Sequence, residues 1–302
     1  MNDTDLSFPH NEDRQEFKEA LAYTESRTGF SSILIEKDYY CSLLLRYLFH
    51  NLNDESKNLV FKGGTCLSKV YVDFYRLSED LDFVIPVDPT ARRQIRRKKI
   101  QLFKTLFERI PQHLPGVSIS EQIRGHNESI QYIGYVQYPS VVYNKEEHVK
   151  VEIGLREPLI ETPELKDAKS IIRNPFTRSE YLSPFTVRVI TIKEAYAEKM
   201  RAALSRREPA IRDFFDLHYA QSTLDFDFFV DDFIHMVRQK LSVPGNDPID
   251  VSQARKRQLV HQAKTHLQSA LRPSDYSSFD IERSFLIVSA VSEQLESLPN
   301  DK

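Results

Sequence analysis

Two glycines and two aspartates in the first third of the chain have the types and spacing needed for phosphate and metal chemistry. Gly63 and Gly64 end an apolar stretch and precede a segment of helical length. Asp80 and Asp82 follow that segment, at the head of the apolar run 83–85. Because side chains two apart in a strand point to the same face, both carboxylates should project together.

This combination of residues favours nucleotide chemistry. Mg²⁺, or Mn²⁺ in its place, takes oxygen ligands, and Mg²⁺ usually keeps one or two protein carboxylates beside water and substrate phosphates. Glycines let backbone N–H groups approach a phosphate closely, and Thr65 could cap the helix that follows. A lone Gly-Gly is usually a turn, and a lone Asp-x-Asp is usually a solvated strand end. Their occurrence on either side of one helix predicts an active site.

The same residues carry a resemblance to known enzymes. The stretch from Gly63 to Asp82 resembles the signature of the nucleotidyltransferase superfamily that shares the DNA polymerase β catalytic fold. Several stretches in matching order resemble, more narrowly, the toxin family of AbiEii/AbiGii and MenT type: 35–40, 63–65, 67–69, 76–82, 198–202 and 212–217. Together they extend over about residues 30 to 220.

The resemblance implies both a fold and a function. The fold would be α/β (α+β), with a polymerase β-like core sheet and flanking helices before a mostly helical C-terminal half. The function would be transfer of NMP from an NTP to an RNA acceptor, with the tRNA 3′ end as the leading candidate, so that translation is blocked. Such an enzyme would be the toxin of a toxin–antitoxin or abortive-infection pair in phage defence, with a cognate antitoxin as partner.

A third carboxylate commonly joins the metal pair from a neighbouring strand, where it can also take a proton from the attacking hydroxyl. Glu152 is the best placed candidate, since it shares a face with Lys150 in an alternating strand. The family more often has Asp there, and a solvated strand-face glutamate is the alternative. Around the glycine turn, the expected nucleotide contacts are Gly63, Gly64, Thr65, Ser68, Lys69 and Arg76.

A second group of candidates follows residue 190. Lys199 lies near Tyr196 at helical spacing, on the apolar side of its predicted helix. A lysine there usually extends its ammonium group to solvent, whereas the family motif implies a contact with the triphosphate. Arg212 is expected to contact the nucleotide as well. The resemblance implies that Asp213 orients Lys199 or the nucleotide; alternatively Asp213 caps its helix, or Asp216 takes this role.

Positive charge is concentrated at residues 92–99, beside apolar positions of the same predicted helix. Such runs are usually solvated faces. Because the rest of the chain is slightly acidic, the arginines of this run are also candidate contacts for RNA phosphates: Arg92, Arg93, Arg96 and Arg97.

Hydrophobic periodicity predicts the elements that position these residues. Helices are expected at 12–28, 33–50 and 91–110, strands between 117 and 155 and at 187–190, and mostly helices beyond 210. The capping box from Thr191 to Glu194 should open another helix. Lys37 and Asp38 are expected to pair with each other within their helix. We place a catalytic domain at residues 1–190 and a helical domain at 191–302.

Composition predicts a soluble, cytoplasmic protein. The 302 residues carry a net charge of -3 and include two cysteines, too few for a disulfide framework. The polar N-terminus indicates no secretory signal, and no apolar run has the length of a membrane span. Two alternatives to NMP transfer onto RNA stay open: NMP transfer onto a protein hydroxyl, and a catalytically idle RNA-binding or interaction module on the same fold.

Overall fold

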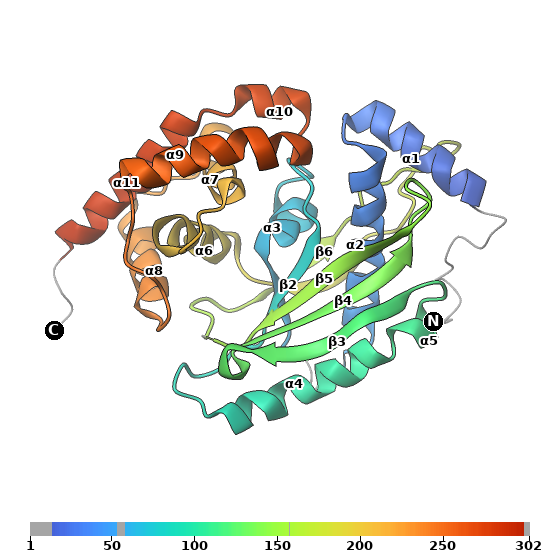
Figure 1. Cartoon of the computed structure of the whole chain (residues 1–302), viewed down its shortest axis with the longest axis horizontal. Coiled ribbons are helices and arrows are strands. Elements are labelled where there is room, and N and C mark those ends of the chain that lie inside the picture. Colours follow the sequence, from blue (N-terminus) through green and yellow to red (C-terminus); the bar gives the residue numbers. More distant parts are fainter. Residues whose placement is uncertain (1–13, 53–57, 157, 299–302) are drawn as a thin grey trace. The chain divides into compact units, whose positions relative to one another are not determined.

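The computed structural model describes residues 14–52, 58–156 and 158–298. The chain divides into two compact units, Met1–Ile190 and Thr191–Lys302. In the part of the chain that is described, the first unit holds a seven-stranded sheet with flanking helices, and the second is built from helices (Figure 1). This mixed α/β architecture confirms the predicted fold class.

The elements of the first unit agree with the predicted helices and strands. The unit contains α1 (Arg14–Thr28), α2 (Ser32–His50), β1 (Val60–Lys62), α3 (Gly63–Cys66), β2 (Asp80–Val84), α4 (Arg93–Glu108), α5 (Ile110–His113), β3 (Ser118–His126), β4 (Gln131–Pro139), β5 (Glu146–Gly154), β6 (Glu164–Ala168) and β7 (Phe185–Val189). After α3 the chain continues as a π-helical turn over Leu67–Tyr71. Strand β6 was not predicted, because prolines interrupt the sequence around it. Residues 12 and 13 of the first predicted helix lie outside the described residues.

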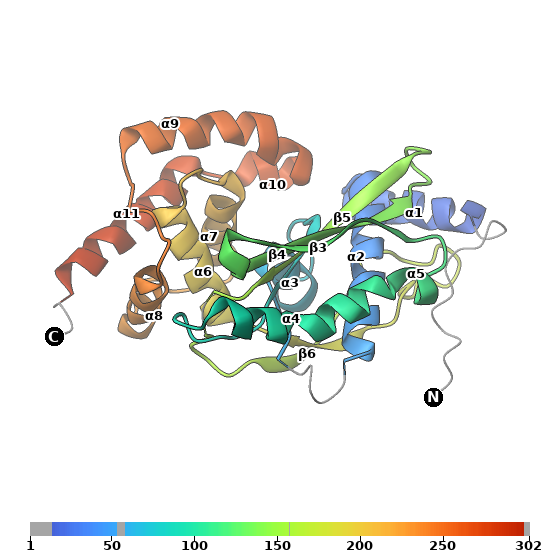
Figure 2. The same ribbon diagram turned by 60° about the horizontal axis from the view of Figure 1, so that its bottom comes forward.

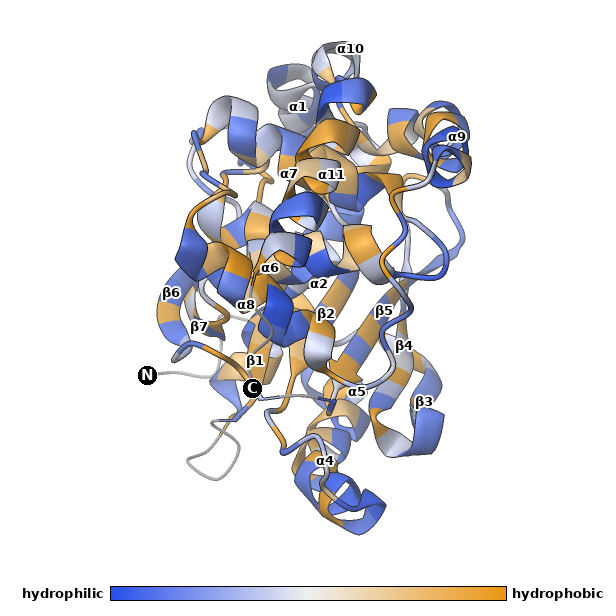
Figure 3. Ribbon diagram, turned by 90° about the vertical axis from the view of Figure 1, so that its left-hand side faces the viewer, coloured by the Kyte–Doolittle hydropathy of each residue, from blue (hydrophilic) through white to orange (hydrophobic). Residues whose placement is uncertain are grey.

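The sheet has the strand order β3-β4-β5-β2-β1-β7-β6. Its central strand β2 runs parallel to β5 and antiparallel to β1. In this register Asp82 lies between Lys62 of β1 and Glu152 of β5. Hydrophilic and hydrophobic residues alternate along the strands (Figure 3), as expected for a sheet with one face in the core.

Helices cover one face of this sheet. The ring of Phe83 in β2 lies 6.0 Å from that of Phe103 in α4 and 6.3 Å from that of Phe49 in α2. The Tyr47 hydroxyl donates a hydrogen bond of 3.0 Å to the Leu106 carbonyl, which joins the two helices. Figure 2 shows α4 and α5 in front of this face. By strand alternation the side chains of Asp80 and Asp82 project from the opposite face.

A buried ion pair connects α2 to the turn after α3. Lys69 Nζ lies 2.6 Å from Asp38 Oδ1 and 2.6 Å from Ser42 Oγ, and the two charged side chains are 0% and 2% exposed. Lys37 pairs with Glu79 instead, at 3.1 Å. The prediction that Lys37 and Asp38 pair with each other is wrong, because adjacent helical residues point in different directions.

The second unit contains α6 (Ile192–Ser205), α7 (Ile211–Thr223), α8 (Asp231–Ser242), α9 (Gln253–Gln262), α10 (Pro273–Ser278) and α11 (Ile281–Ser297). The Thr191 hydroxyl accepts a hydrogen bond from the backbone N–H of Glu194, which confirms the predicted start of α6. Stacked rings of Phe214 and Phe285 join α7 to α11. No helix among the described residues is long and apolar enough to cross a membrane.

The buried pair between Asp38 and Lys69 should contribute strongly to stability. Replacing Asp38 with alanine should lower the free energy of unfolding by about 3–5 kcal/mol, because Lys69 would keep a buried charge without its carboxylate. Urea unfolding followed by circular dichroism measures this change. Lys37→Ala is the matched control: it breaks a partly exposed pair and should cost at most about 1 kcal/mol. Equal losses of unfolding free energy in Asp38→Ala and Lys37→Ala would contradict a strong stabilising role for the Asp38–Lys69 pair.

Candidate active site

The glycine turn and the carboxylate of Asp82 touch each other. Gly63 has a φ of +78°, a conformation that L side chains rarely adopt. A Cβ atom on Gly63 would lie 2.4 Å from Asp82 Oδ2, so only glycine leaves room for this carboxylate. The contact follows from the pairing of Lys62 with Asp82, which places the start of α3 beside β2. The two halves of the predicted motif therefore form one site.

Side chains beneath the turn support it. A Cβ atom on Gly64 would lie 2.4 Å from Arg76 Nη2, and Arg76 is only 1% exposed. Ser68 Oγ donates a hydrogen bond of 2.6 Å to the Arg76 carbonyl, and Lys69 belongs to the buried pair with Asp38. The predicted nucleotide contacts Ser68, Lys69 and Arg76 are thus all buried. Their positions favour holding the turn in shape over touching the nucleotide.

Thr65 does not cap the helix. Helix α3 already begins at Gly63, with Lys62 as its N-cap residue, so the proposed capping role is wrong. The helix starts two residues before Thr65, at Gly63, so Thr65 lies inside it. The Thr65 hydroxyl donates a hydrogen bond to the carbonyl of Asp80 instead, which holds the first residue of β2 beside α3.

Charged residues form two rows across the face of the sheet opposite Phe83. The register places Lys62, Asp82 and Glu152 side by side on β1, β2 and β5, and it places Asp80 beside Lys150. Neighbouring strands lie about 4.8 Å apart, so Asp82 is close to Lys62 and Asp80 is close to Lys150 on the next strand. Burial lowers the pKa of Lys150, but the hydrogen bond and charge of Glu152 and the charges of Asp80 and Asp82 raise it overall.

Glu152 is held by its neighbours. Its Oε1 accepts a hydrogen bond of 2.6 Å from Gln131, and its Oε2 lies 2.6 Å from Lys150 Nζ. Burial raises the pKa of Glu152, but these two bonds and the Lys150 charge lower it overall, so the carboxylate stays ionised. Within the described residues, no group of three or more His, Cys, Asp or Glu side chains is placed to hold a metal ion. The expected cluster of Asp80, Asp82 and Glu152 is therefore not present.

Asp80 and Asp82 still fit a divalent cation as a pair. They offer two hard oxygen ligands on one strand face, at residues 80 and 82 of β2. The first N–H groups of a helix have no partner within that helix, and α3 begins where the Asp82 carboxylate lies. A cation bound by two carboxylates needs further oxygen ligands, and the phosphates of a nucleotide on the turn can supply them.

In the second unit, Lys199 lies between two carboxylates. Its Nζ is 2.7 Å from Asp213 Oδ1 and 2.9 Å from Asp216 Oδ2, and its side chain is 14% exposed. Arg206 Nη1 lies 3.1 Å from the other oxygen of Asp213. Both aspartates orient Lys199, so the choice between them was unnecessary. Ala210, and not Asp213, is the N-cap residue of α7, and Asp213 lies in the first turn of this helix.

Sequence reasoning did not select three residues of these sites. Lys150 could have been found from the two-residue spacing that selected Glu152. Gln131 needed the pairing of β4 with β5, and Arg206 needed the packing around α6; neither pairing leaves a local sequence signal. The predicted RNA contacts Arg92, Arg93, Arg96 and Arg97 lie at the N-terminal end of α4, on the covered side of the sheet.

Loss of either aspartate should abolish divalent cation binding. Asp80→Asn and Asp82→Asn each keep the side-chain shape but remove one charged oxygen ligand. Mn²⁺ binding in the presence of an unreactive NTP analogue, measured by electron paramagnetic resonance, should therefore disappear in both folded variants. Glu152→Gln should keep most of the binding, because Lys150 and Gln131 occupy this carboxylate. An equal loss in Glu152→Gln would show that Glu152 is a metal ligand after all.

Comparison with known proteins agrees with the geometry. The sequence matches the family described as nucleotidyl transferase AbiEii toxin, type IV TA system, over residues 46–286. No curated protein matches the chain at a significant level. MenT4, a nucleotidyltransferase toxin from Mycobacterium tuberculosis, has a similar structure with 18% identity and a TM-score of 0.53, over 92% of this chain and 98% of that chain. The structure of JHP933 from Helicobacter pylori has 18% identity and a TM-score of 0.49, over 88% of this chain and 95% of that chain.

The likeness to MenT4 shows a shared fold, and the sequence match shows the family, since it extends over well more than half of the chain. It also includes the glycine turn, both aspartates of β2 and the Lys199 cluster. The resemblance read from the sequence is confirmed. The protein belongs to the AbiEii family of nucleotidyltransferase toxins of toxin–antitoxin systems.

Proposed function

We propose that this toxin transfers NMP from an NTP to an RNA acceptor in a Mg²⁺-dependent reaction, with the 3′ end of tRNA as the leading candidate. An acceptor modified at that end could not be aminoacylated or used by the ribosome, so translation would stop. The observation that carries the proposal is the contact between Gly63 and the Asp82 carboxylate. It joins a phosphate-binding turn to a metal-binding pair.

The residues of the first unit have separate roles in the proposed reaction. Asp80 and Asp82 would hold Mg²⁺, which when bound lowers the pKa of the attacking hydroxyl and neutralises the triphosphate. The backbone N–H groups at Gly63 and Gly64 bind a phosphate of the NTP. The acceptor oxygen bonds to the α-phosphorus as the bond to pyrophosphate breaks, and the hydroxyl proton leaves to solvent. Glu152, already ionised and bound, keeps Lys150 beside Asp80.

In the second unit, Lys199 is the proposed contact for the triphosphate. An ammonium group has three donors, and Asp213 and Asp216 fix its position through two of them. A fixed cation of this kind can offer charge to the phosphates without reorganising. Arg206 balances the negative charge of Asp213. Arg212, one residue earlier in α7, is a second proposed nucleotide contact.

An RNA acceptor is favoured by the charge of α4. The run at residues 92–99 is mostly exposed, in a chain whose net charge is -3. A protein acceptor would not require such a run, whereas RNA phosphates attract it. The paired aspartates argue against a catalytically idle module. As in other toxin–antitoxin systems, a cognate antitoxin should restrain the enzyme, and a role in cytoplasmic phage defence would follow.

Labelling with purified components tests the reaction. The protein should be incubated with total RNA, Mg²⁺ and each of the four NTPs labelled at the α-phosphate. We expect label to appear in a tRNA-sized band, to require the divalent cation, and to be absent with Asp82→Asn. Label that appears in protein instead would make a protein hydroxyl the acceptor. Absence of label from both, with folded wild-type protein, would favour the idle module.

Substitution of Lys199 should affect the use of NTP. Lys199→Ala should raise the KM for NTP by roughly tenfold or more, because a charge-assisted contact is worth about 1.5–3 kcal/mol. Lys199→Arg should rescue poorly, since the planar guanidinium does not fit between two carboxylates placed for an ammonium group. Lys193→Ala, which breaks a more exposed pair in the same helix, is the control. Normal KM in a destabilised Lys199→Ala variant would assign Lys199 a structural role.

A further inference from the structure

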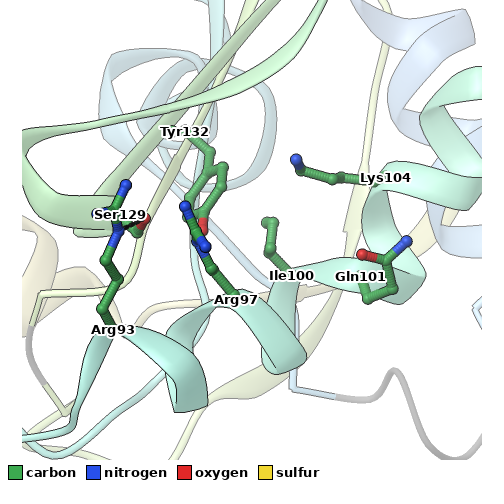
Figure 4. Close-up of a pocket in the computed structure, with 8 residues that line it drawn as sticks. Arg93, Arg97, Ile100, Gln101, Lys104, Ser129 and Tyr132 are labelled. Atoms are coloured by element: carbon green, nitrogen blue, oxygen red, sulfur yellow. Dashed lines mark hydrogen bonds between the residues drawn. The ribbon is translucent and has the colours of Figure 1, made fainter.

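Helix α4 and the β3–β4 hairpin enclose a pocket that lies outside the site described above. Its volume is about 250 Å³. Three of the described residues that line it are cations, Arg93, Arg97 and Lys104, and none is a carboxylate. Gly125, Ser129 and Tyr132 also line the pocket. Figure 4 shows the three cationic side chains extending from α4 beside Ser129 and Tyr132. The lining therefore has the composition of an anion site.

A buried hydroxyl in this pocket has no partner among the described residues. Tyr132 is only 2% exposed, and no described group accepts from or donates to its hydroxyl oxygen. Buried hydroxyl groups are nearly always hydrogen-bonded, since leaving one unpaired is unfavourable. Because Tyr132 lines the pocket, a ligand there can supply the missing partner. This observation is independent of the positive charge.

Two smaller residues, Ser129 and Gly125, fix the shape of the pocket. Ser129 Oγ accepts a hydrogen bond of 3.2 Å from Arg93 Nε, which fixes the guanidinium at the rim. A Cβ atom on Gly125 would lie 3.1 Å from the Tyr132 ring and 3.3 Å from Ser129 Oγ, so glycine keeps this space open. The turn that carries Ser129 has three consecutive non-glycine residues with positive φ, at 127, 128 and 129. Such conformations are unfavourable and are often retained for function.

The charge order of α4 is unfavourable for the helix by itself. Arg93 and Arg97 lie one turn apart near the N-terminus, and the first turn has no acidic residue. The positive end of the helix dipole repels cations, and like charges four residues apart destabilise a helix. A bound anion would remove both penalties. The arrangement thus makes sense for a helix that binds an anion at this end.

We propose that this pocket binds a phosphate group in the backbone of the RNA acceptor. Arg97 and Arg93 would contact the phosphate oxygens through their planar guanidinium groups, and the Tyr132 hydroxyl would donate to one of them. The choice of RNA rests on the proposed function. The phosphate chemistry does not, and a free pyrophosphate or nucleotide offers the same chemistry from a second source.

The position of the pocket favours a large acceptor. Tyr132 pairs with Ile153 and Ile153 with Phe83, so Tyr132 points to the face opposite Asp82. The pocket therefore lies across the sheet from the carboxylates, next to the edge strand β3. A ligand that reaches both places must extend around the sheet, which a folded RNA can do and a mononucleotide cannot.

RNA binding by single-charge variants tests the proposal. Arg97→Gln removes a charge inside the pocket, and Lys98→Gln removes one from the neighbouring exposed residue of α4, which does not line the pocket. Binding of labelled tRNA is measured by fluorescence anisotropy across a salt series, with EDTA to prevent transfer. Arg97→Gln should weaken binding roughly tenfold and reduce the log–log salt slope by about one. Lys98→Gln should change the affinity by less than about threefold.

Tyr132→Phe tests the role of the hydroxyl group without changing the charge of the pocket. Removing the unpaired hydroxyl should leave the free protein as stable as before or more stable, with an equal or higher thermal midpoint. It should still weaken tRNA binding severalfold, with the salt slope unchanged. Equal effects of Arg97→Gln and Lys98→Gln, together with no effect of Tyr132→Phe, would overturn the pocket even if transfer to RNA is observed.

A separate arm identifies the source of the phosphate. Pyrophosphate is titrated against wild type and Arg97→Gln at constant ionic strength, in EDTA, and the thermal midpoint is recorded. One outcome is that pyrophosphate stabilises only wild type while wild type and Arg97→Gln bind tRNA equally well. That result would support a phosphate site in the pocket but overturn its assignment to RNA. This result would hold whether or not RNA proves to be the acceptor in the labelling experiment.

Discussion

The contact between Gly63 and the Asp82 carboxylate is the constraint on which the first unit depends. A nucleotide site needs backbone N–H donors and a metal-binding carboxylate close enough to contact the same phosphate group. A side chain at the turn would hold the N–H groups away from the carboxylate. Glycine at position 63 removes that obstacle, and the antiparallel pairing of β1 with β2 sets the distance. Arg76, buried beneath Gly64, fills the space under the turn and fixes its shape. The shape of the turn is therefore supported by the buried Arg76 side chain.

Placing two aspartates on one face creates an electrostatic problem when no cation is bound. Like charges on one strand face repel, and the cost must be offset by nearby positive charge. Lys62 beside Asp82 and Lys150 beside Asp80 supply that charge from the neighbouring strands. The hydrogen bond and charge of Glu152, and after them the charges of Asp80 and Asp82, raise the pKa of Lys150 despite its burial. Glu152 holds Lys150 in place through its ion pair, so this acidic residue positions the compensating cation.

Local patterns predicted which residues share a face, but not which groups bind each other. The period of two placed Asp80, Asp82, Lys150 and Glu152 correctly on half-exposed positions of their strands. The partner of Lys69 lies 31 residues away in α2, and no spacing rule connects them. The same holds for the Gln131 bond to Glu152, which depends on strand pairing. The partners of these buried or half-buried charges could not be predicted from the sequence, because they are set by the assembled fold.

The ion pairs of Lys199 are compatible with its proposed contact with the triphosphate. Two carboxylates in contact with one ammonium group fix its direction. They would also repel a triphosphate, were it not for Arg206, which brings the cluster to two positive and two negative charges. With the net charge of the cluster near zero, an approaching phosphate would meet a preorganised donor at little electrostatic cost. In the proposed reaction, fixed geometry would then replace net positive charge as the basis of phosphate recognition at Lys199.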